Sequence, residues 1–579
     1  MNFTNQPRRC RAPASNFTYG NHDMKKILTL TLAFTIAILL LTDSFPRVAD
    51  AAPEWQTFSP PHWILGPIQG ADGNEKTVLR NFDEIQKAKI PITAFHFDAP
   101  DWMACTGNLQ FKYSDAVLDR MRARGWRALF WVVPLIGVDC EEYQIAKANG
   151  YFILGDDGEP IVTNNFTGHG SWIDMDNPAA VAYWLTLFDA LRARVGNVLG
   201  GFYTDSVRPD NRSGATEYGE KYARVVLDYT RTHVPDGDVV FKSFGVNTPS
   251  DAWLAQNAHV AYVNDLSTDF AGMKTGIKRV FNASNLMPLP YNEFSGFAKA
   301  APDSETYIRR MHWGAFQPVM ENVPFGKQPW DPIFSPQVMQ TYRYYGTLHR
   351  ELEPYLHTYD QLAFEQHEPL FRDVNRARFS TRLGENIFVQ YVTDYTRSLT
   401  IQLPPGEWVD YWDQKVVYKG DRTITYPVPL GKEPIFIARG AIIPLRVRGG
   451  LTGNGTPNSA NALTLNAYRY GHSSSRYYDD AVGWITLDMT AQKKRLALCT
   501  LDQAPSEPII WRVTTINRKP KTVTEQNGAV GVNTAWGAPL TERRNEAAVG
   551  ASASGWYYDA AAQRLIVKIS TTGTECPAP

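Results

Sequence analysis

Between Pro61 and Arg372, short apolar runs alternate with segments in which apolar residues recur every three or four positions. The first pattern predicts buried strands and the second predicts amphipathic helices. The candidate strands are Ile92–Asp98, Arg127–Pro134, Ser171–Asp174, Gly201–Asp205, Val239–Phe244, Ala261–Asp265, Leu286–Glu293 and Ala315–Glu321. The candidate helices are Glu75–Lys89, Tyr113–Arg124, Ala179–Val195 and Ala215–His233. Strands separated by helices over about 300 residues favour an α/β fold, a (β/α)8 TIM barrel.

The main alternative is an open, doubly wound sheet. Such a sheet usually carries a glycine-rich phosphate-binding turn after its first strand. Here the first candidate strand continues into Asp98-Ala99-Pro100-Asp101-Trp102, a polar and aromatic loop without that turn. We therefore expect the barrel.

After Arg372 the pattern changes to short strands separated by turns rich in glycine and proline. One predicted strand of this part is Ile435–Ile443. All-β sequence of this kind is typical of sandwiches. We expect an upstream extension and secretory signal over residues 1–51, a catalytic barrel over 52–372, a proximal β-sandwich over 373–446 and a distal β-sandwich over 447–579.

The predicted signal has three regions in the usual order. Met24-Lys25-Lys26 precedes an apolar run from Ile27 to Leu41, and Ala49-Asp50-Ala51 supplies small residues for signal-peptidase cleavage. The run is short for a membrane span. We therefore expect a secreted or periplasmic protein that begins near Ala52 and has no membrane association after signal removal.

Four of the five cysteines follow the signal, an even number that predicts disulfides in an oxidising compartment. Three pairings are possible. We favour Cys105 with Cys140 and Cys499 with Cys576, because each pair falls within one expected domain. None of these cysteines has metal-ligand spacing such as C-x-x-C, so no metal site is predicted.

The charge is balanced, with 58 basic and 59 acidic side chains, which gives no reason to expect a nucleic acid or a membrane surface as partner. Candidate chemistry lies instead at the ends of the predicted strands. Several of these ends carry carboxylates, among them Asp98, Asp174, Asp205, Asp265 and Glu293. In a barrel these ends converge on one rim, where barrel enzymes hold their catalytic groups. Each could instead be a cap or an ion-pair partner.

Asp205 follows the fourth predicted strand and Asp265 the sixth, so the two can face each other across the barrel mouth. Retaining glycosidases place two carboxyl groups about 5 Å apart, one as nucleophile and one as acid/base. Asp269 also follows the sixth strand and is the alternative acid. Trp102 and Tyr203 lie near these acids in sequence and fit a sugar site, although aromatic side chains also build cores.

The chain resembles glycoside hydrolase family 31, the α-glucosidase and α-xylosidase group. Phe202-Tyr203-Thr204-Asp205 resembles the nucleophile motif of that family, and Val263-Asn264-Asp265 stands where the family has its acid/base. Phe95-His96-Phe97-Asp98 resembles the first barrel strand, whose Asp binds the sugar. The resemblance implies that Asp205 is the nucleophile and Asp265 the acid/base.

Three departures from the family bear on the substrate. Lys242 replaces the usual Arg, Glu293 stands where Asp is usual, and Val323 stands where many α-glucosidases have His. A site that hydrogen-bonds a sugar hydroxyl discriminates strongly against sugars that lack it. Because these three contacts differ, we do not carry the glucose specificity of the family over to this chain. The candidate substrate-binding residues are Asp98, Trp102, Asp174, Tyr203, Lys242, Glu293 and Arg309.

The resemblance implies a secreted retaining α-glycosidase that hydrolyses terminal α-linked sugars from a carbohydrate substrate. No cofactor is implied. The alternatives are an α-transglycosidase of the same family and a non-catalytic carbohydrate-binding protein with a degenerate barrel.

Overall fold

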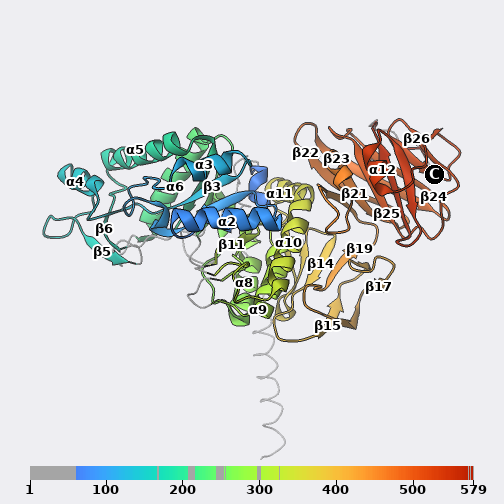
Figure 1. The fold of residues 1–579 in the computed structure, drawn as a ribbon, viewed down its shortest axis with the longest axis horizontal. Coiled ribbons are helices and arrows are strands. Elements are labelled where there is room, and N and C mark those ends of the chain that lie inside the picture. The colour runs from blue at the N-terminus through green and yellow to red at the C-terminus, as the bar shows by residue number, and fades with distance from the viewer. Residues whose placement is uncertain are drawn as a thin grey trace, which may run out of the picture. The chain divides into compact units, whose positions relative to one another are not determined.

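The computed structural model describes residues 60–165, 168–205, 215–242, 253, 256–296, 301–324, 327–570, 573, 576 and 577 (Figure 1). The predicted signal lies outside these residues, as do Ser243 and Phe244 at the end of the predicted fifth strand. Among the helices in the described ranges, none combines the length and apolar character needed to cross a membrane.

Eight strands form one parallel sheet in the order β10-β9-β8-β7-β3-β2-β1-β11. They are β1 (Ile68–Gly70), β2 (Ala94–Phe97), β3 (Arg127–Val132), β7 (Leu199–Thr204), β8 (Asp238–Lys242), β9 (Val260–Tyr262), β10 (Leu289–Tyr291) and β11 (Glu321–Asn322). After β10, the N–H of Phe294 donates to the carbonyl oxygen of Glu321 at 3.0 Å and links the two ends of the sheet. The predicted barrel is confirmed.

Helices lie between the strands, as the alternating pattern predicts. They are α2 (Glu75–Ala88), α3 (Asp115–Arg122), α4 (Glu141–Ala148), α5 (Pro178–Val195), α6 (Ala215–His233), α8 (Phe270–Ala283), α9 (Ser304–Ala315), α10 (Pro336–Glu351) and α11 (Glu353–Gln366). In α2, Asn74 caps the first turn by accepting from the N–H of Thr77 at 3.0 Å. Val78, Phe82 and Ile85 are buried on one face, and Phe82 packs on Phe95 of β2.

One predicted barrel strand is wrong in place, and one true barrel strand was not predicted. Ser171–Asp174 belongs instead to β6 (Gly168–Trp172), which pairs antiparallel with β4 (Leu135–Gly137) and β5 (Val162–Asn165) in a separate sheet. The true first strand, β1, was missed because three residues are too few to show a period. The two errors offset each other, so Asp205 still follows the fourth barrel strand and Asp265 the sixth.

Strand β7 contains one extra residue relative to its neighbour β3. Leu199 pairs with Ala128 and Gly201 pairs with Leu129, which leaves Gly200 between two successive pairs. Gly201 has φ +140°, and a Cβ there would lie 1.8 Å from the carbonyl oxygen of Asp238 in β8. Glycine is therefore needed for the close approach of β7 and β8.

The remainder of the chain is all-β, drawn from yellow to red in Figure 1. The first group of strands is β12 (Phe371–Asn375), β13 (Ser380–Leu383), β14 (Ile387–Gln390), β15 (Ser398–Leu403), β16 (Glu407–Asp410), β17 (Val417–Lys419), β18 (Arg422–Pro427) and β19 (Ile435–Ala438). They form one six-stranded sheet and the β15–β18 pair.

The second group forms sheets of five and six strands and includes the short helix α12 (Glu546–Ala551). Its strands are β20 (Ile442–Leu445), β21 (Leu463–Tyr468), β22 (His472–Asp479), β23 (Gly483–Gln492), β24 (Arg495–Leu501), β25 (Ile509–Thr514), β26 (Val523–Gln526), β27 (Ala529–Val532), β28 (Ala538–Pro539), β29 (Gly555–Asp559) and β30 (Arg564–Ile569). The predicted strand Ile435–Ile443 is divided between β19 and β20, because Gly440 at φ +101° turns the chain from one sheet to another.

The favoured disulfide pairing is confirmed. Cys105 is bonded to Cys140 and Cys499 to Cys576.

Candidate active site

Lys242 joins the two predicted catalytic carboxylates. Its Nζ lies 3.1 Å from Oδ1 of Asp205 and 3.1 Å from Oδ2 of Asp265. Lys242 ends β8, between β7, which leads to Asp205, and β9, which leads to Asp265. The two carboxylate oxygens are therefore at most about 6 Å apart, the sum of the two contacts. That upper limit is below the separation of about 6.5–9.5 Å found in inverting glycosidases.

Asp205 is held by a second neighbouring strand as well. Its side chain is only 6% exposed, and Oδ2 accepts a hydrogen bond from Nε1 of Trp131 in β3 at 3.1 Å. One oxygen thus faces an indole N–H and the other an ammonium group. Both contacts fix the orientation of the carboxylate, as a positioned nucleophile requires.

Burial alone would lower the pKa of Lys242, but the charges of Asp205 and Asp265 outweigh it and raise the pKa above its ordinary value. Lys242 therefore stays cationic at neutral pH. It supplies a point charge between two acids, where an Arg would supply a planar fork.

Asp265 lies at the rim, with its side chain 34% exposed, and is connected to a buried acid through Tyr262. The Tyr262 hydroxyl lies 3.2 Å from Oδ1 of Asp265 and 3.0 Å from Oε1 of Glu293. Burial, followed by the charges of Glu321 and Asp265, raises the pKa of Glu293 well above its ordinary value. A hydroxyl can donate only one hydrogen bond at a time, so Tyr262 donates either to Glu293 or to Asp265.

A polar layer inside the barrel surrounds Tyr203. The Tyr203 ring stacks on His96 with ring centroids 4.2 Å apart, and Tyr203 is 5% exposed. Nδ1 of His96 lies 3.0 Å from Oε1 of Glu321, whose other oxygen accepts from the Tyr291 hydroxyl at 2.7 Å. Burial opposes protonation of His96, but the negative charge and hydrogen bond of Glu321 have the larger combined effect and raise the pKa of His96. Tyr203 therefore packs inside the barrel, where it helps to orient β7, and its ring does not present an open face on which a sugar could stack.

Asp98 follows β2 near this layer. Its side chain is 13% exposed, and Oδ1 lies 3.7 Å from Nε2 of His96. A further acid, Asp72, follows β1, and burial together with the charge of Asp98 raises its pKa well above the ordinary value. Sequence reasoning missed Asp72 because it missed β1.

Three candidate substrate-binding residues lie elsewhere. Trp102 is fully buried against Phe130 and has no face open to a sugar. Asp174 follows β6, outside the barrel sheet, and accepts from the N–H of Asp176 at 2.9 Å in the turn before α5. In these positions, neither side chain directly contacts Asp205 or Asp265.

Arg309 is also fully buried, and its guanidinium binds the all-β part of the chain. It forms an ion pair with Glu433 at 2.6 Å and donates to the carbonyl oxygens of Thr396 and Val428. Arg309 therefore fixes α9 to the following sheet, a structural role that its sequence position did not reveal.

The alternative acid, Asp269, is a helix cap. Its Oδ1 accepts from the N–H of Gly272 at 2.9 Å at the start of α8, and that hydrogen bond lowers the pKa of Asp269. Asp269 is thus occupied as a cap of α8, whereas Asp265 shares Lys242 with Asp205, and this placement favours Asp265 as the general acid. Trp131 and Tyr262, which contact Asp205 and Asp265, were missed because interior strand aromatics give the same sequence signal as core residues.

Comparisons with known proteins identify the family of this chain. The family model of the glycosyl hydrolases family 31 TIM-barrel domain matches residues 57–237 and 248–359, and that of the family 31 C-terminal domain matches residues 362–443. An isomaltosyltransferase from Sporosarcina globispora is 22% identical, over 89% of this chain and 52% of that protein. The chain spans about half the length of the curated relatives it matches first.

Solved structures show the same fold. A cycloalternan-forming enzyme from Listeria monocytogenes, in complex with a pentasaccharide substrate, superposes with a TM-score of 0.73 at 19% identity, over 90% of this chain and 54% of that one. A family 31 dextranase from Flavobacterium johnsoniae, complexed with glucose, gives 0.74 at 18% identity, over 90% and 70%. The family models together span more than half of the sequence, and the chain belongs to glycosyl hydrolase family 31.

Proposed function

We propose that this protein is a secreted or periplasmic retaining α-glycosidase that removes terminal α-linked sugars from oligo- or polysaccharides. The observation that carries the proposal is the short separation of Asp205 and Asp265, both in contact with Lys242. Asp205 attacks the anomeric carbon and forms a glycosyl-enzyme, while Asp265 protonates the leaving oxygen and then activates water.

Other features support parts of the proposal. Two disulfides fit an oxidising compartment. Asp98 follows β2, 3.7 Å from His96, and is proposed to bind sugar hydroxyls, whereas Tyr203 and Glu293 act by supporting His96 and Tyr262. The barrel proposed over 52–372 carries the chemistry, and the sandwiches proposed over 373–446 and 447–579 follow it, although β20 (Ile442–Leu445) pairs with the second group, so the boundary between them lies before β20.

Transglycosylation is the second candidate, because one relative is named isomaltosyltransferase and one structural neighbour is a cycloalternan-forming enzyme. In that case a second sugar replaces water in the second step at the same two carboxylates.

A panel of aryl α-glycosides tests the proposal, with the first product followed by proton NMR. We expect colour release and an α-configured first sugar, because two inversions give net retention. A β-configured first product would contradict the covalent mechanism, and no release from any α-glycoside would favour a binding protein. Longer oligosaccharides that grow with added acceptor would identify a transglycosidase.

Lys242 offers a separate test through the pH dependence of activity. The charges of Asp205 and Asp265 raise the pKa of Lys242, so the ammonium interacts strongly with both acids. Replacing Lys242 with Gln removes the cation and makes ionisation of the buried nucleophile less favourable. The acidic limb of the kcat/KM profile is therefore expected to move to higher pH by about 1 unit or more.

Lys242→Arg is the matched control, since it retains the positive charge and restores the residue usual in the family. Its acidic limb is expected to stay close to that of the unchanged protein. If the acidic limb of the kcat/KM profile does not shift in Lys242→Gln, Lys242 does not influence the ionisation that controls activity.

A further inference from the structure

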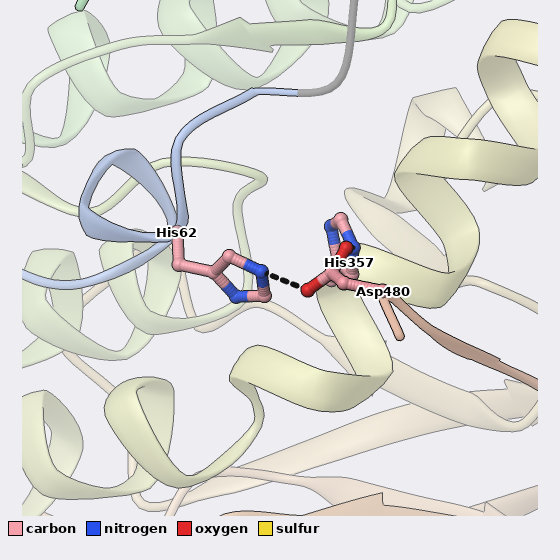
Figure 2. Close-up of side chains that lie close together, drawn as sticks. All are labelled: His62, His357 and Asp480. Atoms are coloured by element: carbon pink, nitrogen blue, oxygen red, sulfur yellow. Dashed lines mark hydrogen bonds and ion pairs between the residues drawn. The ribbon is translucent and has the colours of Figure 1, made fainter. Parts of the chain in front are cut away.

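A second cluster of polar side chains lies away from the barrel mouth, where three distant segments meet. His62 comes from the turn η1 (His62–Leu65) that begins the described chain, His357 from α11, and Asp480 from the turn between β22 and β23 (Figure 2). They border a cavity of about 160 Å³. None of these residues contacts Asp205 or Asp265 in the active site, so the cluster requires its own explanation.

The ligating atoms of the cluster converge on one point. Nε2 of His62 lies 2.5 Å from Oδ2 of Asp480, and Nε2 of His357 lies 2.9 Å from Oδ1 of the same carboxylate. The two imidazole rings are 4.4 Å apart between centroids. One ligand atom from each residue lies within 4.8 Å of the others, which is the spacing that allows one ion to contact all three.

The surroundings hold these side chains in place. Nδ1 of His62 is hydrogen-bonded to the carboxylate of Glu353, which leaves Nε2 directed toward Asp480. Metal-binding histidines commonly have such a carboxylate on the other ring nitrogen, because it fixes the ring and raises its basicity. The turn that carries Asp480 is fixed by Asp479, which accepts from the N–H of Ala481 at 2.9 Å and from the Ser506 hydroxyl at 2.8 Å.

The turn is also fixed to the helix that carries His357. The N–H of Tyr478 donates to Oγ1 of Thr358 at 3.1 Å, and Thr358 directly follows His357 in α11. The positions of His357 and Asp480 are therefore set by backbone contacts that do not depend on their own hydrogen bond. Such preorganisation lowers the cost of binding an ion.

The charge around the cavity favours a cation. Its lining contains four carboxylates, those of Glu353, Asp479, Asp480 and Glu507, against the single guanidinium of Arg446. Arg446 is paired with Glu507, and Arg350 lies 3.8 Å from Glu353. After both arginines are counted, an excess of two negative charges remains on the carboxylates, which a proton on His62 offsets only in part. Partly buried charge of one sign is costly without a counter-ion, and a divalent cation that displaces this proton would balance it.

We propose that His62, His357 and Asp480 bind a divalent transition-metal ion of the zinc class. Two imidazole nitrogens and one carboxylate oxygen are a ligand set that zinc accepts, with water as the fourth ligand. The side chains of His62 and Asp480 are 46% and 54% exposed, which leaves room for that water. The ion would join the start of the barrel, α11 and the β22–β23 turn, and the proposal is independent of the proposed function.

The test begins with full-length protein that has been treated with a chelator and then dialysed against zinc at neutral pH. We expect about one zinc per chain by elemental analysis and a higher Tm than the chelated protein shows. His357→Ala and Asp480→Asn are expected to lose both the bound zinc and the zinc-dependent rise in Tm. Cobalt provides a second readout, because visible absorption bands would report a low-symmetry site with nitrogen and oxygen ligands.

The matched control is His472→Ala. His472 also pairs with a carboxylate, Asp488, at 2.8 Å, but it lies outside the cluster. This variant is expected to keep the zinc. The proposal would be overturned if the unchanged protein bound no zinc, or if His472→Ala lost as much zinc as the cluster variants. His62, His357 and Asp480 would then form only an ion-paired contact between three segments. If His357→Ala fails to fold, the more exposed His62→Gln takes its place, and retention of zinc there would equally count against the site.

Discussion

Replacing Asp205 with Asn is expected to lower kcat/KM by at least about a thousandfold, because the covalent nucleophile is lost and several kcal/mol are added to the barrier. Asn has nearly the size of Asp, and its amide oxygen can still accept from Trp131. Lys242 retains Asp265 as an ionic partner. The thermal unfolding midpoint should therefore change little, and circular dichroism together with aryl glycoside kinetics would measure both quantities.

Asp174→Asn is the control for this experiment. Asp174 is a strand-end aspartate in the same chain, but it follows β6 outside the barrel sheet and makes a turn contact that Asn can retain. Activity close to that of the unchanged protein is expected. If Asp205→Asn kept more than about a tenth of the activity, the nucleophile would have to be another residue.

Replacing Asp265 with Ala is expected to give a strong dependence on the leaving group. A good leaving group departs without a proton, so the first step survives, the second step slows, and the glycosyl-enzyme accumulates on Asp205. A poor leaving group needs the acid, and its turnover should fall by about 100-fold or more. Azide should rescue turnover of the good substrates and give an α-configured glycosyl azide, which proton NMR and mass spectrometry would identify.

Asp269→Ala supplies the comparison, because Asp269 is close in sequence but caps α8 through Gly272. Loss of this cap should lower the free energy of unfolding by about 1 kcal/mol. The dependence of turnover on the leaving group should stay as in the unchanged protein. Azide rescue in Asp269→Ala and its absence in Asp265→Ala would transfer the acid/base role to Asp269.

The sequence was sufficient for the barrel and for the convergence of Asp205 and Asp265, which both contact Lys242. Long strands such as β3 and long helices such as α6 carry a clear period, and a carboxylate at the end of an apolar run marks the rim. The position of Lys242 between the two acids also follows from strand order, because β8 lies between β7 and β9. These features depend on local pattern plus the topology of one known fold.

The remaining features depend on contacts that local pattern does not contain. Arg309 pairs with Glu433, 124 residues away, and a buried guanidinium has the same sequence signal as one that binds a sugar. Trp102 is fully buried, yet its polar neighbours suggested a rim position. Similarly, no spacing rule joins His62 to Asp480, because 418 residues separate them. Such pairings arise only when whole elements pack.

The extra residue in β7 limits how this enzyme can evolve. Side chains alternate along a strand, and beyond Gly200 the alternation places Tyr203 and Asp205 toward the barrel interior, while Phe202 packs against Phe188 of α5. Loss of that single residue would exchange the two sets and direct Asp205 toward the helices. Insertions or deletions of a single residue are therefore incompatible with this strand, even where substitutions within it are tolerated.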